Sequence, residues 1–313
     1  MIPQPSRRPT PGVADATLDV AAVDGADLGR AVRVAARALR AAGVPSPDVD
    51  ALALAAHLLG VAPGEARRRA IVGGVAPPGY AALVARRAER VPLQHLTGSA
   101  PFRGLDLHVG PGVFIPRPET ELLVEAAVAE VARVAAQDTA RLPRVVDLCT
   151  GSGAIALAVA HESPGVRVWA VELSEDALAY AARNVTESGR DVTLLAGDAT
   201  ATLPDLDPLD GSVDVVTCNP PYIPEGAVPR DPEVRDYDPP MALYGGSDDG
   251  LVIPGRLATR AWRLLRSGGL LLMEHGDAQG ESLPALLREL GWCEVHDAAD
   301  LAGRPRLASA RRP

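Results

Sequence analysis

The N-terminal third of the chain carries apolar side chains at the spacing of α-helices. From Asp27, a residue type that caps helix N-termini, apolar positions recur on one face while arginines occupy the other. Glycines and prolines interrupt this pattern at intervals that fit helix ends. Three helices are expected, at about residues 27–42, 46–60 and 78–91. Residues 26–99 are therefore predicted to form a small helical bundle domain.

The pattern changes after residue 99. Residues 100–117 contain short alternating runs broken by Gly110-Pro111-Gly112, which favours a hairpin linking two domains. Pro118 is well placed as the first residue of a helix that runs to about Ala136. Residues 118–313 are expected to form the larger domain.

From Arg144 onward, short apolar runs alternate with helical patterns. Strands are expected at 145–148, 166–171, 192–196, 213–218 and 270–273, and two further runs at 293–296 and 306–310 could complete the sheet. Helices are expected from 154, at 174–187, at 251–266 and at 282–290. This alternation predicts an α/β fold with an open, largely parallel sheet covered by helices on both faces. Ligands of such folds bind beyond the carboxyl ends of the strands.

Composition limits the class of protein. The 313 residues suffice for one large domain and a smaller one. Residues 1–25 are rich in Pro, Thr and Asp and are expected to be a disordered tail, with no apolar block typical of a secretory signal. The longest apolar stretch, Ala51–Ala62, is shorter than the roughly 20 residues of a membrane span.

Charge and cysteine content narrow the chemistry. The net charge is −9, which disfavours a protein that binds duplex phosphates. The sequence contains no lysine, which excludes a Lys Schiff base and a P-loop lysine. Three well-separated cysteines, Cys149, Cys218 and Cys293, indicate reduced thiols and a cytoplasmic protein. Zinc-ligand spacing is absent, so no metal site is expected.

The first candidate site is a glycine-rich turn between a strand and a helix. Its residues are Asp147, Leu148, Cys149, Thr150, Gly151, Ser152 and Gly153. Glycines allow a ligand to approach the backbone, and the following helix offers free N–H groups. Glu172 ends the next strand, where related folds place an acid against ribose hydroxyls, and Asp198 follows the third strand. The alternative is a tight turn with two surface acids, since the full dinucleotide glycine pattern is absent.

The second candidate site is Asn219-Pro220-Pro221-Tyr222, directly after the fourth strand. Two prolines fix the backbone and remove two N–H donors, while their carbonyl groups stay available. Asn219 adds an amide oxygen, so the segment offers acceptors suited to a planar –NH2 group. Tyr222 offers a flat wall. A proline turn that merely closes the strand is the alternative interpretation.

These two sites together resemble those of methyltransferases that act on amino or amide nitrogens, either adenine N6 or glutamine N5. From about residue 27 to the end, the chain resembles the peptide chain release factor glutamine methyltransferase family. The likeness is carried by three further segments: Phe114–Glu121, the run from Leu243 through Gly245-Gly246 to Leu251, and Asp300–Arg306. The resemblance implies a Rossmann-like class I methyltransferase sheet and S-adenosylmethionine as cofactor. It also implies methylation of the glutamine in the Gly-Gly-Gln loop of release factors, a modification linked to translation termination.

The resemblance also assigns roles to residues. Thr150, Gly151, Ser152 and Gly153 would contact the methionine part of the cofactor, and Glu172 would hold the ribose where the family commonly has Asp. Asp147, Asp198, Ala199 and Asn219 complete the expected cofactor site. Asn219, Pro220, Pro221 and Tyr222 would bind the target glutamine, with Asn219, Pro220 and Tyr222 as the catalytic residues. Cys149 stands where the family usually has Gly, and His275 is interpreted as a packed or partly exposed histidine rather than a base.

Two other functions remain open on the sequence alone. One is an adenine methyltransferase acting on RNA or DNA, which would share both sites. Its best support is a stripe of arginines, Arg30, Arg33, Arg37 and Arg40, although a solvated helix face also explains the stripe. The second open function is that of a non-enzymatic binding module with a methyltransferase fold and an inactive site. A serine hydrolase fits poorly, because Gly151-Ser152-Gly153 is not a G-x-S-x-G elbow. The expected protein partner is a release factor, and the helical domain would recognise the body of that factor. Binding to a membrane or stable binding to nucleic acid is not expected.

Overall fold

The computed structural model describes residues 23–313, which fold as two compact units with their boundary between Thr97 and Gly98. Most of the expected disordered tail, residues 1–25, lies outside the described residues. Its last three residues are ordered, contrary to that expectation. Val23 is buried, and the Asp24 carboxylate accepts hydrogen bonds from the backbone N–H groups of Gly79 and Ala81, both at 2.8 Å.

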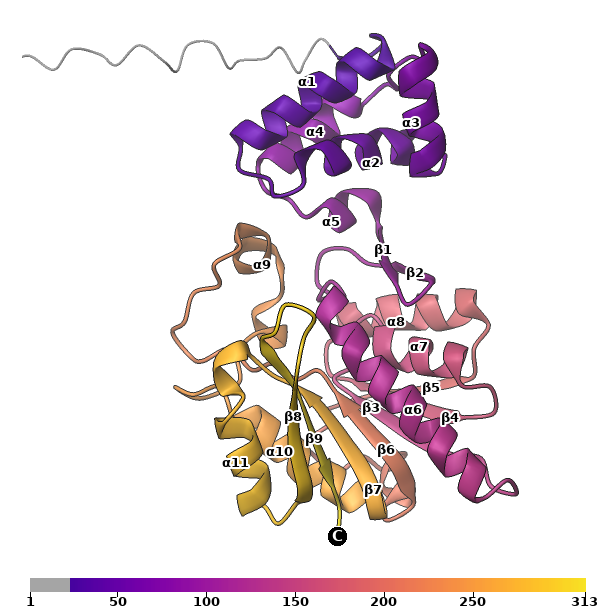
Figure 1. Ribbon diagram of the computed structural model, residues 1–313, viewed down its shortest axis with the longest axis vertical. Helices are drawn as coiled ribbons and strands as arrows, with labels where there is room; N and C mark the ends of the chain where they lie inside the picture. The colour runs from indigo at the N-terminus through magenta and orange to yellow at the C-terminus, as the bar shows by residue number, and fades with distance from the viewer. Residues whose placement is uncertain (1–22) are drawn as a thin grey trace, which may run out of the picture. The chain divides into compact units, whose positions relative to one another are not determined.

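The first unit is a bundle of short helices (Figure 1). They are α1 Leu28–Ala41, α2 Pro47–Leu59, α3 Pro63–Val72, α4 Tyr80–Ala88 and α5 Leu93–Thr97. The three expected helices are confirmed, and the Asp27 carboxylate caps α1 by accepting from the Arg30 N–H at 2.8 Å. The helices α3 and α5 were not expected. The helix α3 has a charged centre, with Glu65 and the arginines at 67–69, and Ala66 is its single buried residue.

Small residues let the helices of this unit approach closely around a few large side chains. Leu28, Leu39, Leu54 and Tyr80 are fully buried, and the Tyr80 hydroxyl donates to the Ala51 carbonyl at 2.8 Å. A buried ion pair joins Arg87 of α4 to Asp50 of α2 at 2.8 Å. Among the described residues no single helix is long and apolar enough to cross a membrane, whereas the bent pair α2–α3 passes the same test of length and composition.

The second unit contains a hairpin and a seven-stranded sheet. The hairpin strands are β1 Ser99–Phe102 and β2 Leu105–His108. The sheet strands are β3 Arg144–Leu148, β4 Arg167–Glu172, β5 Val192–Ala196, β6 Val213–Cys218, β7 Leu265–Glu274, β8 Cys293–Ala299 and β9 Pro305–Arg311. Their order is β5-β4-β3-β6-β7-β9-β8, with β3 to β7 parallel and β9 antiparallel to both of its neighbours. The predicted α/β fold is confirmed.

Helices and short helical turns connect these strands. The helices are α6 Glu121–Gln137, α7 Ala154–Glu162, α8 Glu175–Ser188, α9 Pro232–Tyr237, α10 Val252–Leu264 and α11 Ser282–Glu289. The 3₁₀ turns are η2 Pro118–Thr120, η3 Asp207–Leu209, η4 Pro240–Ala242 and η5 Asp277–Gln279. The helix expected to continue to residue 266 ends at Leu264, because β7 begins at Leu265 and pairs there with Val213 ahead of a bulge.

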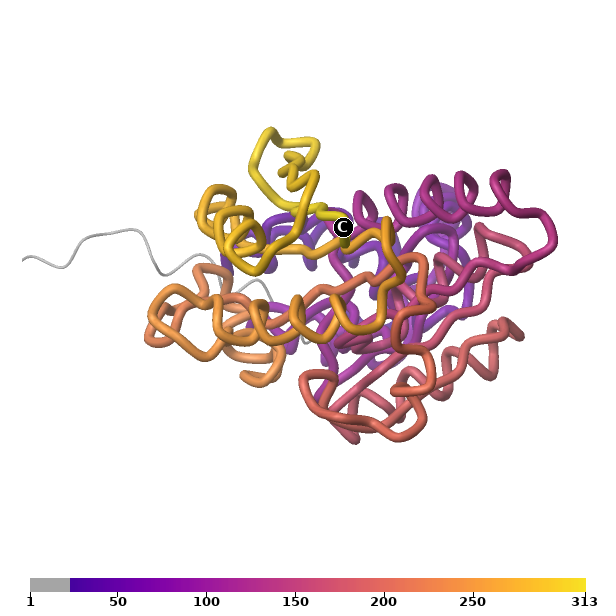
Figure 2. Tube along the Cα trace, turned by 90° about the horizontal axis from the view of Figure 1, so that it is seen from below, coloured from indigo at the N-terminus to yellow at the C-terminus, as the bar shows by residue number. Residues whose placement is uncertain are grey.

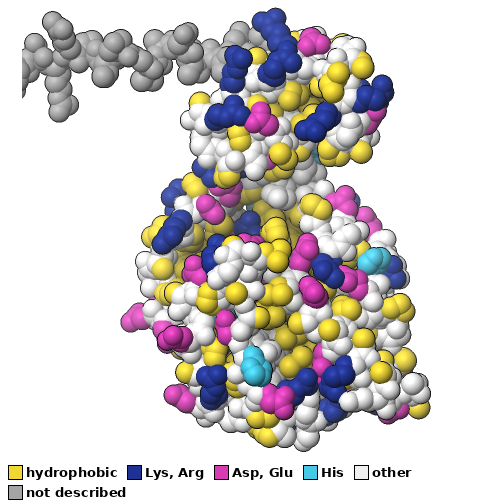
Figure 3. All heavy atoms as spheres, viewed as in Figure 1, with side chains coloured by type: hydrophobic (Ala, Val, Ile, Leu, Met, Phe, Trp, Pro, Cys, Tyr) yellow, Lys and Arg dark blue, Asp and Glu magenta, His cyan; other side chains and the backbone are white. Residues whose placement is uncertain are grey.

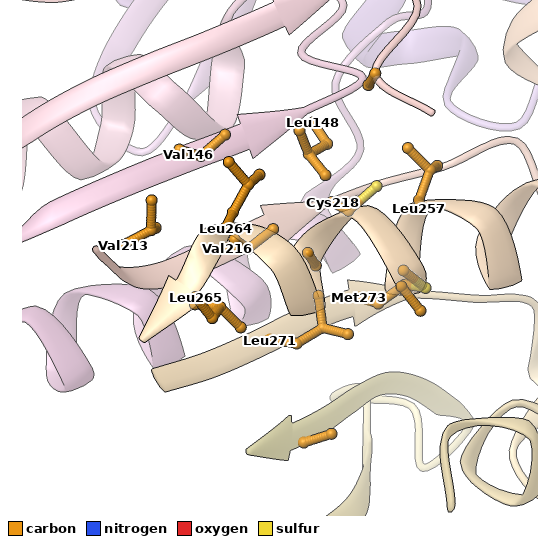
Figure 4. Close-up of a cluster of buried hydrophobic side chains, with 14 of the residues drawn as sticks. Val146, Leu148, Val213, Val216, Cys218, Leu257, Leu264, Leu265, Leu271 and Met273 are labelled. Atoms are coloured by element: carbon orange, nitrogen blue, oxygen red, sulfur yellow. The ribbon is translucent and has the colours of Figure 1, made fainter. Parts of the chain in front are cut away.

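Successive residues of the central strands point to opposite faces of the sheet, and each face has its own hydrophobic core. Val145 of β3 packs with α6 and α7, whereas its neighbour Val146 packs with α10 and α11. Leu271 and Leu272 of β7 divide between the two cores in the same way. Figure 4 shows the core beneath α10, and Figure 2 shows α6 and α10 on opposite sides of the strands.

The strand order creates the crevice in which the functional residues lie. Chain connections run outward from β3 in one direction to β4 and β5, and in the other direction to β6 and β7. The loops after β3 and β6 therefore separate at the carboxyl edge of the sheet, which is where open α/β sheets bind ligands. Both candidate segments found in the sequence, after Leu148 and after Cys218, begin at this edge.

Candidate functional site

A cavity of about 890 Å³ lies within the second unit at the carboxyl ends of the parallel strands. This volume is within the range of sites for cofactors and small molecules. Of the residues predicted from the sequence, those that line the cavity are Thr150, Gly151, Ser152, Glu172, Asp198, Ala199, Asn219, Pro221 and Tyr222. The structure thus brings both candidate segments to the wall of one cavity.

Three predicted residues, Asp147, Gly153 and Pro220, do not contribute to that lining. Asp147 is fully buried behind the turn, where it accepts hydrogen bonds from the hydroxyls of Thr150 at 2.6 Å and Thr217 at 2.8 Å. Burial raises its pKa to about 7. Asp147 therefore links the turn to the neighbouring strand β6 from inside the protein, while the residues after it face the cavity.

The turn after β3 has a left-handed backbone. Cys149 has φ of 63° and Gly151 has φ of 58°. This conformation costs an L-residue about 1–2 kcal/mol, so Cys149 carries backbone strain that a glycine would avoid. A side chain placed on Gly151 would meet no atom within 4 Å, so this backbone borders the open cavity. A ligand can therefore lie directly against the peptide groups of the turn.

Glu172, at the end of β4, connects the turn to the opposite wall. Its carboxylate accepts the Gly151 N–H at 2.7 Å and the Ser174 N–H at 2.8 Å, one on each oxygen. A carboxylate has about four acceptor positions, so some acceptor capacity remains for a ligand. Burial raises the pKa of Glu172, and hydrogen bonds from the backbone N–H groups of Ser174, Gly151 and Leu173 oppose that rise. The geometry suits a pair of neighbouring hydroxyl donors such as a ribose diol.

Asp198 and Ala199 follow β5 on the same side of the cavity. Asp198 is exposed, and its Oδ1 accepts from the backbone N–H of Thr200 at 2.8 Å and from the hydroxyl of Thr200 at 2.7 Å. Ala199 is buried in the core beneath α10. Asp198 thus shapes its own loop and leaves its second oxygen available, whereas Ala199 offers only a small apolar surface.

The segment after β6 presents hydrogen-bond acceptors. Asn219 donates through Nδ2 to the Thr120 hydroxyl at 3.4 Å. Within residues 23–313, no donor reaches Asn219 Oδ1 or the carbonyl oxygen of Pro220. Gln279 anchors the segment by donating to the Tyr222 carbonyl at 2.9 Å. Two free acceptors on a rigid backbone can hold the two hydrogens of a planar –NH2 group.

Several lining residues were not singled out from the sequence. Glu274, at the end of β7, is only 3% exposed, and burial raises its pKa to about 7. It accepts from the Thr120 hydroxyl at 2.7 Å and contacts the Tyr222 hydroxyl at 3.5 Å. Burial also raises the pKa of Tyr222. The signal in the sequence was an acid at the end of the apolar run Leu270–Met273, in the same position relative to β7 as Glu172 is to β4.

An aromatic and arginine pair forms another part of the wall. Arg117 lies 5.0 Å above the ring of Phe114 and pairs with the buried Asp238 at 2.6 Å. Burial raises the pKa of Asp238 to about 6, while Arg117 opposes the rise. This pair connects the segment that follows the hairpin to the loop between β6 and α10. Sequence inspection recognised the Phe114–Glu121 segment but gave it no role in the site.

Comparison with known proteins places this architecture in a family. Residues 145–229 match a family described as "Methyltransferase domain", and residues 30–98 match "PrmC N-terminal domain". The chain is 44% identical over 290 residues to the release factor glutamine methyltransferase of Bifidobacterium longum, covering 89% of this chain and 97% of that protein. It is 50% identical to the Streptomyces coelicolor protein of the same name, over 90% and 96% of the two chains. The chain belongs to the release factor glutamine methyltransferase family.

Another relative differs in its named substrate. It is the 4-amino-L-phenylalanine/4-methylamino-L-phenylalanine methyltransferase of Streptomyces pristinaespiralis, 40% identical over 84% of this chain and 88% of that protein. This chain therefore aligns over most of its length with relatives that are named for different substrates. The shared domain makes the chain an S-adenosylmethionine-dependent methyltransferase with a class I fold.

The residues of this family member fit its cofactor. Gly151 exposes backbone to the cavity, and Glu172 keeps acceptor capacity for ribose hydroxyls. The Glu172 carboxylate also fixes the turn by accepting the Gly151 N–H. His275 is fully buried between the Gly276 carbonyl at 2.8 Å and Asp297 at 2.6 Å. Of the two alternatives left open for His275, packed or partly exposed, the structure shows the packed one.

Proposed function

We propose that this protein transfers the methyl group of S-adenosylmethionine to the side-chain N5 of the glutamine in the Gly-Gly-Gln loop of peptide chain release factors. The observation that carries the proposal is the free acceptor Asn219 Oδ1 in the wall of a cavity of cofactor size, followed directly in the chain by the free carbonyl oxygen of Pro220. Membership of the release factor glutamine methyltransferase family supports the same target. In this arrangement the turn after β3 and Glu172 hold the cofactor.

The chemical difficulty is that an amide nitrogen is a poor nucleophile, because its lone pair is delocalised into the carbonyl group. Bound S-adenosylmethionine supplies an electrophilic methyl group. The oxygens of the Asn219 side chain and the Pro220 carbonyl accept hydrogen bonds from the two N–H groups of the target, which orients its nitrogen and increases the electron density there. Positioning of this kind contributes up to about 7–11 kcal/mol in favourable cases. The excess proton leaves to water after transfer, so the proposal requires no catalytic base.

Tyr222 and the apolar part of the wall complete the target site. The Tyr222 side chain lies against Glu274, and Phe114 and Met241 also line the cavity. These flat and apolar surfaces exclude water from the reacting groups, which strengthens the hydrogen bonds to the amide. The carboxamide plane of glutamine can lie against such surfaces while its hydrogens point to Asn219 and Pro220.

Two alternative substrates use the same acceptors. An adenine N6 target is not favoured by the named relatives, and charged side chains of both signs are spread among apolar ones on the faces seen in Figure 3. An aromatic amine is the second candidate, because the relative from Streptomyces pristinaespiralis is named for such a substrate. Phe114 and Tyr222 offer aromatic surface for that ring.

The first experiment measures transfer of a labelled methyl group to a purified release factor. A matched factor in which the loop Gln is changed to Ala serves as the control, and free 4-amino-L-phenylalanine is assayed in parallel. Label on the intact factor alone supports the proposal. Label on the Ala factor, or on the aromatic amine alone, refutes glutamine as the target.

A second experiment isolates the acceptors. Asn219→Ala is expected to lose on the order of 10²–10³-fold in kcat, the usual cost of one aimed hydrogen-bonding group. Binding of S-adenosylmethionine, measured by calorimetry, should persist because the turn and Glu172 are unchanged. Equal loss of transfer and of cofactor binding would show that Asn219 supports the cofactor instead.

We further propose that the helical unit recognises the body of the release factor. Ile71 and Val72 at the end of α3 are 79% and 68% exposed, and Val75 is 64% exposed. Clustered exposed apolar side chains mark contact surfaces more often than isolated ones do. Ile71→Ser combined with Val72→Ser should raise the KM for the whole factor and leave that for a short loop peptide unchanged. An equal effect on both substrates contradicts this assignment.

A further inference from the structure

Glu274 is a buried carboxylate in the wall of the target site that the transfer chemistry does not use. It ends β7, is 3% exposed, and lies among hydroxyl groups. Placing an acid in such surroundings is costly unless its hydrogen bonds have a function or a compensation. Its nearest partner, the Thr120 hydroxyl at 2.7 Å, also contacts Asn219.

The Thr120 hydroxyl has a single hydrogen and two acceptor positions. An ionised carboxylate can only accept, so the hydrogen of Thr120 points to Glu274. The oxygen of Thr120 then offers only lone pairs toward Asn219. Asn219 must therefore present its NH2 group to Thr120, in agreement with the Nδ2–Oγ1 contact of 3.4 Å.

This series of hydrogen bonds, from Asn219 to Thr120 and from Thr120 to Glu274, fixes which end of the Asn219 amide faces the substrate. The two ends have nearly the same shape, so packing alone distinguishes them weakly. If the amide were reversed, its oxygen would meet the lone pairs of Thr120, and its NH2 group would face the –NH2 group of the target. Two hydrogen-bond donors, the NH2 group of Asn219 and that of the target, would then face each other. The amide nitrogen of the substrate would lose its hydrogen-bond acceptor.

We propose that Glu274 and Thr120 are positioning residues that hold Asn219 with its carbonyl oxygen toward the target amide. The inference rests on the proposed glutamine methylation for its catalytic consequence, while the hydrogen-bond chain itself is a property of the protein alone. It also gives a role to Thr120 of the Phe114–Glu121 segment. That segment supplies the link between the end of β7 and the end of β6.

The chain of donors depends on the charge of Glu274. A protonated Glu274 can donate to Thr120, which frees the Thr120 hydrogen to turn toward Asn219 and permits the reversed amide. The groups facing Glu274 are Thr120 and Glu119 of η2, Cys218 of β6, Tyr222 after β6 and Arg306 of β9. His275, which directly follows this strand, is held by Asp297 and Gly276. Burial raises the pKa of Glu274 to about 7, and Arg306 and Thr120 limit the rise.

The kinetic test compares Thr120→Val, Thr120→Ser and Glu274→Gln, with Thr259→Val on the exposed face of α10 as a matched control. Thr120→Val should lower kcat roughly tenfold or more, the order expected for one hydrogen bond, and leave the Kd for S-adenosylmethionine unchanged. Thr120→Ser should restore most of kcat because it keeps the hydroxyl. A full kcat in Thr120→Val would overturn the proposal.

The pH profile separates positioning from support of the fold. In the wild type, kcat should fall as the pH decreases through about 7, because protonation of Glu274 releases the fixed orientation. Glu274→Gln, which cannot ionise, should lack this decrease. The same acidic decrease in both proteins would assign it to another group and refute the role of Glu274.

A measurement without any methyl acceptor keeps this inference separate from the proposed function. In ¹⁵N-labelled protein, the side-chain NH2 resonances of Asn219, identified by their loss in Asn219→Ala, should shift as the pH passes about 7. The shift should vanish in Glu274→Gln and in Thr120→Val. Resonances that do not respond to pH would overturn the inference, even if release factors are methylated. The expected shifts would support it even if the acceptor is another compound.

Discussion

Glu274 should make the folded protein less stable as the pH rises, and the size of this effect follows from its burial. The carboxyl group is 3% exposed, and its pKa rises from 4.5 to about 7 in the folded protein. The folded state therefore binds this proton more tightly than the unfolded state does. The contribution of the group to stability is complete below about pH 4.5 and is lost as the pH rises to about 7. At 1.36 kcal/mol for each pKa unit, the total change is roughly 3 kcal/mol.

Glu274→Gln removes this titration while keeping a side chain of nearly the same shape. Between pH 5 and pH 8, the free energy of unfolding of the wild type should fall by about 2 kcal/mol more than that of the variant. Other buried acids, such as Asp147 and Asp238, titrate in both proteins and cancel in the comparison. The assay is urea unfolding followed by tryptophan fluorescence. Trp169, Trp262 and Trp292 all lie in the second unit, so they report on the unit that contains Glu274.

Glu130 supplies a control of opposite sign. It is buried, but hydrogen bonds from Arg133 and Arg311 outweigh the effect of burial and lower its pKa to about 2. Its stabilisation is present above the unfolded pKa and is lost only as the pH falls toward 2. Glu130→Gln should therefore destabilise the protein equally at pH 5 and pH 8. If wild type and Glu274→Gln show the same pH dependence, Glu274 ionises as an ordinary solvated acid and the reasoning is refuted.

Three further predictions follow from the remaining contacts. Glu172→Gln should raise the Kd for S-adenosylmethionine about 10–100-fold by calorimetry, because a charged acceptor is lost; an unchanged Kd would exclude Glu172 from the cofactor site. Cys149→Gly should raise stability by about 1 kcal/mol in thermal unfolding because it relieves a left-handed φ, and a decrease would show that Cys149 packing outweighs the strain. Asp50→Ala leaves the Arg87 charge buried without its carboxylate and should destabilise the helical unit by about 3–5 kcal/mol, measured as loss of helix by circular dichroism. The control Asp48→Ala removes an exposed carboxylate and should have little effect.

The strands of the larger unit were predictable because their residues are apolar over short, bounded runs. The expected bounds of β5 and β6, 192–196 and 213–218, agree with the structure. Buried parallel strands produce such continuous runs, and the register of the alternation then assigns each side chain to one face. The early start of β7 was not predictable, since it depends on a pairing of Leu265 with Val213 that crosses a bulge. Long-range pairing leaves no local pattern.

The candidate site was predictable where one segment carries the chemistry. The turn after β3 and the Asn219–Tyr222 segment are each contiguous, and the topology rule places both at the same edge of the sheet. The positioning pair was not predictable, because Thr120 and Glu274 are far apart in sequence and become meaningful only through contact. The helix α3 escaped detection because a mostly exposed helix has no strong apolar stripe.

The strand order has a consequence for synthesis of the chain. The strand β9 follows β8 in sequence but lies between β7 and β8 in the sheet. The cofactor-side strands β3 to β5 are complete once residue 196 has left the ribosome, whereas the edge of β7 stays uncovered until residues 305–311 arrive. An uncovered edge strand is a template for wrong pairing. Interruption of synthesis between β7 and β9 should therefore yield aggregation-prone proteins whose β7 edge is exposed.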